Sequence, residues 1–461
     1  MEINTEVQSI CPICNKPVRA RYIKEGSDIV LRKTCEEHGD FAALVSEYEE
    51  DYIKWMEFSS VNVPPKTAIT TGKKDECPLH CGTCEQHLMT ACCVLLDITE
   101  RCNQKCPYCF ASANEDPSKD PTLKKIESQY DRLLELGETR PFNIQLSGGE
   151  PTVRDDLPEI IKIGRSKGFE YIQLNTNGKR IAEEPGYAQK LKEAGVTTVF
   201  LQFDGTNDEI YMALRAEPLL DTKLKAIDEC RKARIPVTLV PTVVKNVNLN
   251  NIGDMVRFML ENLNVIKGIH FQPVSFFGRH PESDFQNRVT MFNVMREIEK
   301  QTDGLIKREE LVPISTGHQL CCFCANFLRE KNGTLKSLMS EEQKSDGMDC
   351  CCSEPDPEEI VRKDRDFVLN KWEVSDKPEG GCCTPPDVEV SDCCCEATDD
   401  EPQDFDEFLT YVRNNMFTIS GMAFMDESNL DAERLKRCRV QVFTEDERLI
   451  PFCGYNSIYR Q

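Results

Sequence analysis

The stretch DITERCNQKCPYCFASAN, residues 97–114, decides how the rest of the chain is interpreted. It holds three cysteines, Cys102, Cys106 and Cys109, spaced C-x₃-C-x₂-C, with no obvious fourth ligand beside them. A structural zinc site takes four ligands, so a zinc knuckle is the weaker interpretation. Three thiolates can instead hold three irons of a [4Fe–4S] cluster and leave the fourth iron open. The spacing therefore predicts a metal centre with an open position, where chemistry can occur.

The whole chain is acidic and rich in cysteine. Its 461 residues include 25 cysteines, and its formal net charge is −23. Cysteines with these spacings, in a long chain that shows no signal peptide, are typical of metal ligands and not of disulfides. The negative charge repels phosphate backbones and argues against nucleic acid as a partner. No apolar run is long enough to span a bilayer, so we expect a cytoplasmic protein whose membrane contact, if any, is peripheral.

Short apolar runs alternate with helix-like stretches across the cysteine-poor part of the chain. The runs are VLLDIT (94–99), FNIQLS (142–147), YIQLN (171–175), TTVFLQF (197–203), PVTLVPTVV (236–244) and GIHFQPVSF (268–276). Strands that alternate with helices predict βαβ units and a parallel sheet, either a partial barrel or an open doubly wound sheet. In both folds functional side chains lie at the carboxyl ends of the strands. The cysteine array directly follows the first of these strands.

Two further strand ends carry residues suited to a ligand. They are Gly148, Gly149 and Glu150 in QLSGGEP (145–151), and Asn175 and Asn177 in LNTNG (174–178). A glycine pair allows close approach of the backbone to a ligand, and a carboxylate can accept hydrogen bonds from an ammonium group. The asparagines can bind a ribose or a carboxylate, and an Asn-Gly turn is an equal alternative.

Cysteines on either side of the predicted sheet form further groups. Cys77, Cys81 and Cys84 repeat the C-x₃-C-x₂-C spacing, and Cys92 is the candidate fourth ligand of an auxiliary [4Fe–4S] cluster, with the adjacent Cys93 as its alternative. A zinc site is the other interpretation of this group. A second auxiliary cluster is predicted in the C-terminal part. Its candidate ligands are Cys324, Cys438, Cys453 and either Cys321 or Cys322.

The N-terminal part contains a set that suits one metal ion. Cys11, Cys14, Cys35 and His38 form a C-x₂-C…C-x₂-H pattern. Such a set predicts a tetrahedral mononuclear site for zinc or for rubredoxin-like iron, and the histidine favours zinc. Residues 339–407 are instead acidic and rich in Pro, Gly and Ser, which predicts an irregular insertion. Its eight cysteines have no assigned role.

The array of residues 102–109, followed by GGEP one strand later, resembles the signature of radical S-adenosylmethionine (SAM) enzymes. In that family the open iron binds the amine and carboxylate of SAM, and an electron from the cluster cleaves SAM to a 5′-deoxyadenosyl radical that abstracts hydrogen from the substrate. The resemblance implies that Tyr108 belongs to the signature and that GGEP holds the methionine amine. It also implies that Gln202 and Arg215, in and after LQFDG (201–205), bind the SAM carboxylate.

Several segments together resemble one branch of that family, the archaeal tetraether lipid synthases and the related proteins described as pterin methylases. They are CPLHCGTCEQH, LSGGEPTVRDDLPEII, VFLQFDG, LVPTVVKNVN, GIHFQPVSFFGR and RLIPFCGYN. The resemblance covers nearly the whole chain apart from 339–407. It implies a partial (β/α)₆ radical SAM barrel with a small N-terminal rubredoxin- or zinc-ribbon-like domain and a C-terminal Cys-rich auxiliary-cluster domain. The boundaries implied are 1–75, 76–93 for the auxiliary-cluster segment, 94–320 for the barrel, and 321–461.

For function, the resemblance implies the coupling of lipid alkyl chains by carbon–carbon bond formation. The alternatives are a radical methylase or coupling enzyme that acts on a pterin or another small molecule, and a peptide-modifying radical SAM enzyme. A methylase needs a methyl source, and no cobalamin-binding D-x-H-x-x-G segment is visible. A metal-storage or electron-transfer protein is the non-enzymatic alternative. A low-potential ferredoxin or flavodoxin is the expected electron donor for the enzyme.

Overall fold

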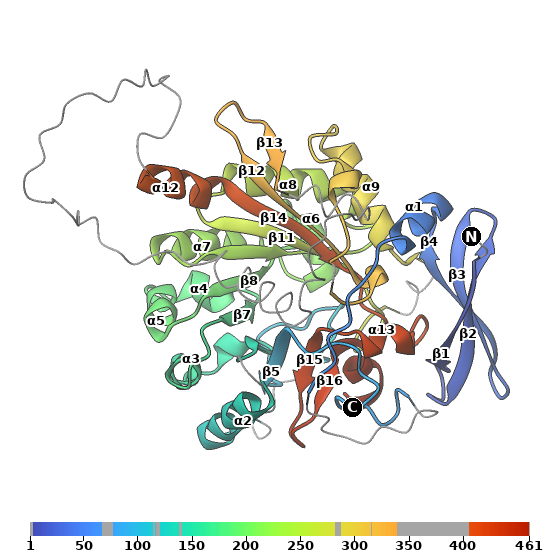
Figure 1. The fold of residues 1–461 in the computed structure, drawn as a ribbon. Helices are drawn as coiled ribbons and strands as arrows, with labels where there is room; N and C mark the ends of the chain where they lie inside the picture. Colours follow the sequence, from blue (N-terminus) through green and yellow to red (C-terminus); the bar gives the residue numbers. More distant parts are fainter. Residues whose placement is uncertain are drawn as a thin grey trace, which may run out of the picture.

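The computed structural model describes residues 3–66, 77–113, 116, 120–137, 141–281, 287–314, 316–338 and 405–460 (Figure 1). Of the insertion predicted at 339–407, only the start of helix α12 (Phe405–Asn415) falls within these ranges. The eight cysteines of the insertion lie outside the described residues.

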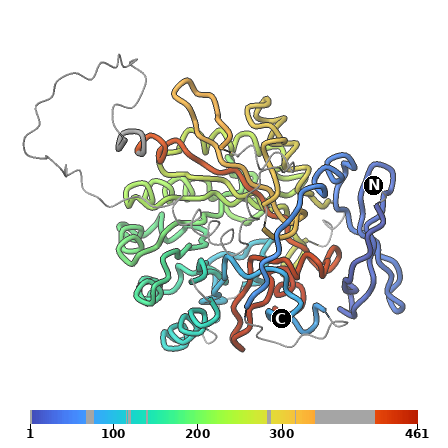
Figure 2. Tube along the Cα trace, viewed as in Figure 1, coloured from blue at the N-terminus to red at the C-terminus, as the bar shows by residue number. Residues whose placement is uncertain are grey.

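The N-terminal part is a four-stranded antiparallel sheet. Its strands are β1 (Asn4–Ile10), β2 (Pro17–Glu25), β3 (Asp28–Cys35) and β4 (Gly39–Ser46), in spatial order of the sequence, and helix α1 (Glu49–Met56) follows. Side chains along β3 alternate between buried and exposed, as expected for a sheet with one covered face. The predicted metal ligands lie at two turns at the same end of this sheet. Cys11 and Cys14 lie between β1 and β2, and Cys35 and His38 lie where β3 turns into β4. The sheet stands at one side of the molecule, beside the C-terminal segment coloured red (Figure 2).

A second, 12-stranded sheet forms the body of the protein. Each of the six apolar runs forms a strand: β5 (Cys93–Thr99), β6 (Asn143–Gly148), β7 (Ile172–Thr176), β8 (Thr198–Gln202), β9 (Val237–Val240) and β11 (Ile266–Pro273). These strands are parallel and adjacent in chain order, and β10 (Thr242–Val243) pairs with β11. The helices between and after them are α2 (Leu123–Leu136), α3 (Leu157–Ser166), α4 (Lys179–Glu183), α5 (Tyr187–Ala194), α6 (Asp208–Arg215), α7 (Leu220–Lys232), α8 (Ile252–Glu261) and α9 (Met291–Gln301).

Strands from the C-terminal part extend this same sheet at both edges. On one side β14 (Met416–Met422) runs parallel to β11, and β12 (Cys322–Arg329) and β13 (Leu335–Ser337) follow antiparallel. On the other side β15 (Val440–Phe443) pairs parallel with β5 and forms the expected hairpin with β16 (Leu449–Pro451). The segment 321–461, predicted as a C-terminal domain, therefore shares its sheet with the barrel. Helices α13 (Ala432–Lys436) and α14 (Phe452–Gly454) complete it.

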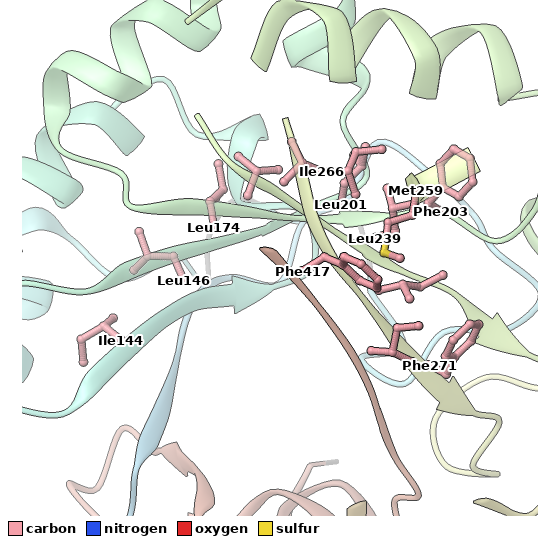
Figure 3. Packing of buried hydrophobic residues seen from close by; sticks show 14 of the residues in the cluster. Ile144, Leu146, Leu174, Leu201, Phe203, Leu239, Met259, Ile266, Phe271 and Phe417 are labelled. Atoms are coloured by element: carbon pink, nitrogen blue, oxygen red, sulfur yellow. The ribbon is translucent and has the colours of Figure 1, made fainter. Parts of the chain in front are cut away.

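The two faces of the large sheet differ in chemistry. Figure 3 shows the face that packs against the helices, with aliphatic and aromatic side chains from β6 to β14 and Met259 from α8. The labelled residues Ile144, Leu146, Leu174, Leu201, Phe203, Leu239, Met259, Ile266, Phe271 and Phe417 are all fully buried. Full burial of each such side chain contributes about 1.5–3 kcal/mol. The alternate residues point to the opposite, inner face, where polar side chains such as Gln145, Asn175 and Gln202 remain partly exposed.

Buried hydrogen bonds fasten the N-terminal sheet to the C-terminal part. The Tyr22 hydroxyl donates to Asp431 Oδ2 at 2.7 Å, and the Lys33 ammonium donates to the carbonyl oxygen of Glu427 at 2.6 Å. Ser9 Oγ donates to the carbonyl oxygen of Leu430 at 2.6 Å. Burial is the main reason that the pKa of Tyr22 lies well above its usual range, with the Asp431 charge adding to it. The bonded residues are 421, 409 and 394 positions apart in the sequence, so these contacts join the two ends of the chain.

Candidate functional site

The cysteine array forms a loop at the carboxyl end of β5. Backbone contacts hold the loop on several sides: the amide of Gly149 donates to Thr99 O at 2.8 Å, and the amide of Cys109 donates to Arg279 O at 2.8 Å. Arg279 also donates from its amide to Cys109 O at 2.9 Å and from Nε to Cys106 O at 2.8 Å. The loop is therefore shaped by neighbouring strand ends and not by its own sequence alone.

The three thiols of the loop lie near one another in a largely desolvated place. Burial raises the pKa of Cys102 to about 12, and the Glu150 carboxylate and the Cys106 and Cys109 thiols add to this shift. Burial also raises the pKa of Cys106, although Arg215 nearby opposes the effect. Thiols in such surroundings stay protonated until a cation neutralises the thiolates. This donor set, three soft sulfur ligands in one partly buried loop, fits a [4Fe–4S] cluster.

The glycine pair of the GGEP motif seats β6 against the cysteine loop. A side chain at Gly148, whose φ is +118°, would place Cβ 2.1 Å from Thr99 O. A side chain at Gly149 would place Cβ 2.1 Å from Arg101 O. Close approach of backbone was predicted here, and the structure shows that the approaching group includes the chain's own loop.

Glu150 is held rigidly by four donors. Its Oε1 accepts from the Thr152 amide at 3.0 Å and from the hydroxyls of Thr152 and Thr176, each at 2.6 Å. Its Oε2 accepts from the Asn177 amide at 2.6 Å. The residue is 2% exposed. Because a carboxylate oxygen has two lone pairs, Oε2 can accept one more donor, which suits the ammonium group predicted from the motif.

The structure separates the two asparagines of LNTNG. Asn177 lies at the strand end, where its Nδ2 donates to Asn103 Oδ1 in the cysteine loop at 2.7 Å. Gly178 adopts φ +79° directly after it, so the predicted Asn-Gly turn is also present. Asn175 lies deeper in the strand and hydrogen-bonds to Gln173 and Gln145. Both were predicted to bind the cofactor, and only Asn177 contacts the cysteine loop by a hydrogen bond in the structure.

Arg215 is committed mainly to the protein itself. Its guanidinium donates to both oxygens of Asp204, at 2.7 and 2.8 Å, and to Thr242 Oγ1 and Tyr108 O, both at 3.0 Å. Four of its five N–H groups are therefore used. The bond to Tyr108 O ties α6 to the cysteine loop, and the guanidinium also lies beside the Cys106 thiol. Asp204, fully buried, was not singled out by the sequence analysis, although it stands in the LQFDG motif with an arginine following.

Lys223 is a second residue that the sequence analysis missed. Its ammonium is fully buried and donates to the Asn177 carbonyl oxygen at 2.6 Å and to Gln202 Oε1 at 2.9 Å. The bond to Oε1 orients the Gln202 side chain so that its amide nitrogen is left for a ligand. The helical spacing of Lys223 from Ala226, Ile227 and Cys230 could have identified it, because all four lie on the buried stripe of α7.

Replacement of Lys223 by methionine should change how stability depends on pH. Burial lowers the pKa of Lys223 to about 8, from 10.5. Between these values the unfolded chain holds a proton that the folded protein lacks, so the wild type gains stability as pH rises, by about 1.4 kcal/mol per pH unit from this group. Urea unfolding between about pH 7.5 and 10, a range that includes the Lys223 pKa of about 8, measures this dependence. The free energy of unfolding of the Lys223→Met variant should not rise with pH in this way. Lys225→Met, at an exposed position of the same helix, is the control and should follow the wild type.

The N-terminal set forms a compact group of ligand atoms. Cys11 Sγ and Cys35 Sγ lie 3.7 and 3.5 Å from His38 Nδ1, and Cys14 Sγ lies 3.9 Å from Cys35 Sγ. Zn–S bonds of about 2.3 Å at tetrahedral angles place two sulfurs roughly 3.8 Å apart. Among the described residues, no other group of three or more His, Cys, Asp or Glu ligand atoms is this close. The geometry fits one tetrahedral metal ion.

Removal of that metal should unfold the N-terminal sheet locally. Cys14→Ser should lower the bound metal by about one equivalent, because a structural site with a weakened ligand set loses its ion and the folding energy it supplies. Elemental analysis measures the loss, and limited proteolysis within residues 3–47 reports the opening. Cys230→Ser, at a buried position in α7, should retain the metal. Unchanged metal content in Cys14→Ser would contradict the assignment.

Cysteines of residues 77–84 lie near a cysteine of the C-terminal part. Cys77, Cys81 and Cys84 line one pocket together with His87. Cys438 has the Cys81 thiol of this group as a neighbour. Burial raises the pKa of Cys438 to about 12, and the nearby Cys321 and Cys81 thiols add to this shift.

The backbone amides of Cys92 and Cys93 both donate to the carbonyl oxygen of Arg439, the residue directly after Cys438. Burial, and then the neighbouring Cys92 thiol, place the pKa of Cys93 well above its usual range, although a hydrogen bond with the Gln145 side chain opposes the shift. The Cys92 ligand assignment stays a prediction, and Cys438 is the thiol that the structure places near Cys81.

The second predicted auxiliary set is partly assembled. Burial and the nearby Cys438 and Cys321 thiols raise the pKa of Cys453. Cys453 Sγ accepts a hydrogen bond from the Met425 amide at 3.2 Å. Cys322 and Cys324 lie on one face of β12, and Cys322 is buried. Auxiliary clusters at these two places remain predictions.

Comparison with known proteins agrees with this geometry. Residues 96–259 match the radical SAM superfamily, and residues 3–47 match the HMPTM N-terminal zinc ribbon domain. The chain is 34% identical to 7,8-dihydro-6-hydroxymethylpterin dimethyltransferase of Methanocaldococcus jannaschii, over 98% of this chain and 93% of that protein. It is also 34% identical to a probable GTP 3′,8-cyclase of Pyrococcus horikoshii, over 53% of this chain and 82% of that protein.

Among solved structures, the Streptococcus suis protein SuiB bound to precursor peptide SuiA is similar in part. The match covers 47% of this chain and 46% of that one, with 16% identity and a TM-score of 0.39. No helix in the described part of the chain has the length and apolar character needed to cross a bilayer. The family match confirms the predicted fold class, a radical SAM barrel with an N-terminal zinc-ribbon-like sheet.

The family also confirms the predicted cofactors, SAM and a [4Fe–4S] cluster. The assignment of the cluster to Cys102, Cys106 and Cys109 stays a prediction. The chain belongs to the radical SAM superfamily of enzymes, in the branch that includes the M. jannaschii pterin dimethyltransferase.

Proposed function

We propose that the protein acts on a reduced pterin, from which it abstracts hydrogen to prepare a carbon for methylation. The observation that supports this most is the near full-length similarity to a protein named as a pterin dimethyltransferase. Lipid coupling was the first expectation from the sequence, and the comparison favours its small-molecule alternative. The inner face of the sheet agrees, because Gln145, Asn175 and Gln202 offer amides where an alkyl chain would need apolar surface.

The chain's own residues position the reactants. When bound, the cluster and SAM supply hydrogen-atom abstraction from unactivated C–H bonds. Cys102, Cys106 and Cys109 would hold three irons, Glu150 Oε2 would accept from the cofactor ammonium, and the Gln202 amide would donate to its carboxylate.

Aromatic side chains pack against one another beside the end of the cysteine loop. Phe110, directly after the last cysteine of the loop, lies 5.5 Å from the ring of Phe452 and is 37% exposed. Phe424 and Phe277 lie 4.6 and 6.1 Å from the same ring. Phe424 also packs with the cluster that holds Cys453, a candidate ligand of the second auxiliary cluster.

In the proposed reaction, one pterin C–H bond would break and its hydrogen atom would pass to the 5′-deoxyadenosyl radical, which gives 5′-deoxyadenosine. That radical would come from SAM, which would accept one electron from a low-potential ferredoxin or flavodoxin and release methionine. With a second SAM as methyl source, its methyl cation and one further electron form the new C–CH₃ bond, and S-adenosylhomocysteine leaves. This proposal therefore requires a reductant and a sulfonium methyl donor.

The test uses reconstituted protein under anaerobic conditions with dithionite and SAM carrying a deuterated methyl group. Parallel reactions contain 7,8-dihydro-6-hydroxymethylpterin, an archaeal-type lipid extract, or neither. We expect 5′-deoxyadenosine above background only with the pterin, together with deuterated methyl groups in the pterin product. Deoxyadenosine and coupled chains in the lipid reaction alone would overturn the proposal in favour of lipid coupling. Deoxyadenosine in neither reaction would also reject it.

A further inference from the structure

We infer that the inner face of the large sheet carries the binding site for the flat, amide-bearing ring of the substrate. The site is built on Asn175, Phe200 and Thr238, with Gln145 on one side and His270 on the other. We call these five residues the inner-face row. The inference rests on the proposed function and deepens it, because it names the residues that would recognise the pterin.

Strand register places the central three residues side by side. Asn175 of β7 pairs with Phe200 of β8, and Phe200 pairs with Thr238 of β9. Residues that pair in this way point to the same face of a sheet. Their chain neighbours Leu174 and Leu201 are fully buried in the helix-covered core, so the row points to the opposite face.

Four of the five residues of the inner-face row remain accessible in spite of their central position, and Thr238 is buried between them. Gln145, Asn175, Phe200 and His270 are each partly exposed, although they stand in interior strands of the sheet. Central strands whose second face is packed show full burial on both faces. Partial exposure therefore indicates open space against the inner face, next to polar side chains.

A directed chain of hydrogen bonds orients the amides. The Tyr171 hydroxyl donates to Gln173 Oε1 at 3.1 Å, and Gln173 Nε2 donates to Asn175 Oδ1 at 2.7 Å. Asn175 Nδ2 then donates to Gln145 Oε1 at 3.4 Å. Each primary amide has two N–H donors and two carbonyl lone pairs. Asn175 is thus left with one donor and one acceptor side by side, which complements the lactam and amidine edge of a pterin.

Thr238 supplies an independent sign of a missing ligand. It is 4% exposed, and its Oγ1 has no hydrogen-bond partner among the described residues. Buried hydroxyls are normally paired, so an unpaired one calls for a partner that the chain does not provide. Register with Phe200 sets this hydroxyl on the face where the substrate would lie.

Phe200 and His270 provide a surface for ring stacking. Their ring centroids are 5.8 Å apart with an interplanar angle of 41°. His270 Nδ1 and Ser420 Oγ share a hydrogen bond at 2.9 Å, which leaves Nε2 for a ligand. Burial lowers the pKa of His270 to about 4, so the ring is neutral near pH 7.

The row also lies at a suitable depth. Asn175 and Phe200 stand two residues before Asn177 and Gln202 on the same strands. At about 3.3 Å per residue, the row is roughly 7 Å below the strand ends that face the cysteine loop. A ring bound there lies beneath the cofactor site, within reach of a radical formed at that end.

The test measures the affinity of 7,8-dihydro-6-hydroxymethylpterin for the reconstituted holoenzyme, with SAM present and no reductant. We expect Asn175→Leu to raise the pterin Kd about tenfold and Thr238→Val to raise it several-fold, while the Kd of SAM stays within about twofold of wild type. Thr238→Val removes no hydrogen bond to any of the described residues, so it should keep the wild-type Tm. The control is Thr198→Val, whose hydroxyl donates to Pro236 O at 3.0 Å. It should lower Tm and leave the pterin Kd unchanged.

The outcomes separate this inference from the proposed function. Unchanged pterin Kd in both Asn175→Leu and Thr238→Val, with pterin turnover intact, overturns the inference and leaves the proposed function standing. A large rise in the Kd of SAM for Asn175→Leu also overturns it, because Asn175 would then serve the cofactor as first predicted. Absence of pterin binding by the wild type rejects both.

Discussion

Replacement of Cys106 by alanine should reduce 5′-deoxyadenosine formation to the level seen without protein. Cys106 is 7% exposed and lies among the other two thiols of the loop, with Arg215 beside it. With only two thiolates left, the loop cannot hold three irons, so iron should fall by about four per chain and sulfide with it. Iron and sulfide analysis and chromatography of 5′-deoxyadenosine check this directly.

Cys230→Ala is the matched control for this loss. Cys230 is also buried, but it packs in the hydrophobic core on α7 and takes no part in the predicted clusters. The truncation should cost about 1 kcal/mol of stability while iron content and turnover stay at wild-type values. Full deoxyadenosine formation by Cys106→Ala would show that another set of thiols carries the catalytic cluster.

Replacement of Gly149 by alanine should displace the cysteine loop. The added Cβ would meet Arg101 O at 2.1 Å, Arg101 C at 2.6 Å and Glu100 O at 2.7 Å, all of them backbone atoms that cannot rotate away. Relief of this overlap breaks the bonds from the Gly149 amide to Thr99 O and from the Glu150 amide to Arg101 O. We expect a loss of roughly 3 kcal/mol and a large fall in cluster content, measured by urea unfolding and by iron analysis.

Gly186→Ala tests whether the effect comes from the overlap. Gly186 has φ +77°, and a Cβ there would have no atom within 4 Å. It should lose only about 1 kcal/mol, the cost of a left-handed conformation for alanine, and should keep its iron. If Gly149→Ala behaved in the same way, the close packing of β6 against the loop would not be needed for cluster binding.

The sequence and the structure agree best where residues are close along the chain. The C-x₃-C-x₂-C array lies within one loop, and the Cys11, Cys14, Cys35 and His38 set comes together at the turns of one small sheet. Short spacing within the array and within each ligand pair limits how far apart these side chains can lie. Residue type and spacing were therefore sufficient to predict which side chains come together. The six strands were also predictable, because buried parallel strands leave continuous apolar runs bounded by turns.

The structure adds most where a side chain's partners come from distant segments. Binding of the cofactor carboxylate by Arg215 stays a prediction, and the structure shows that most of its donors bond to Asp204, Thr242 and Tyr108. Lys223 was not predicted at all, since a lysine on a helix is usually exposed, yet it is buried between two strand ends. Neither arrangement follows from local pattern.

The sequence alone therefore determined the chemistry that this protein can support: three thiolates for an open cluster, a tetrahedral metal site, and a parallel sheet with ligand-binding motifs at its strand ends. Local spacing and alternation encode these features. Only the tertiary structure decided which polar groups are already paired, that Asn175 lies deeper than Asn177, and that C-terminal strands complete the sheet. Those outcomes depend on strand register and on packing between segments far apart in the chain, and such contacts leave no short-range pattern in the sequence.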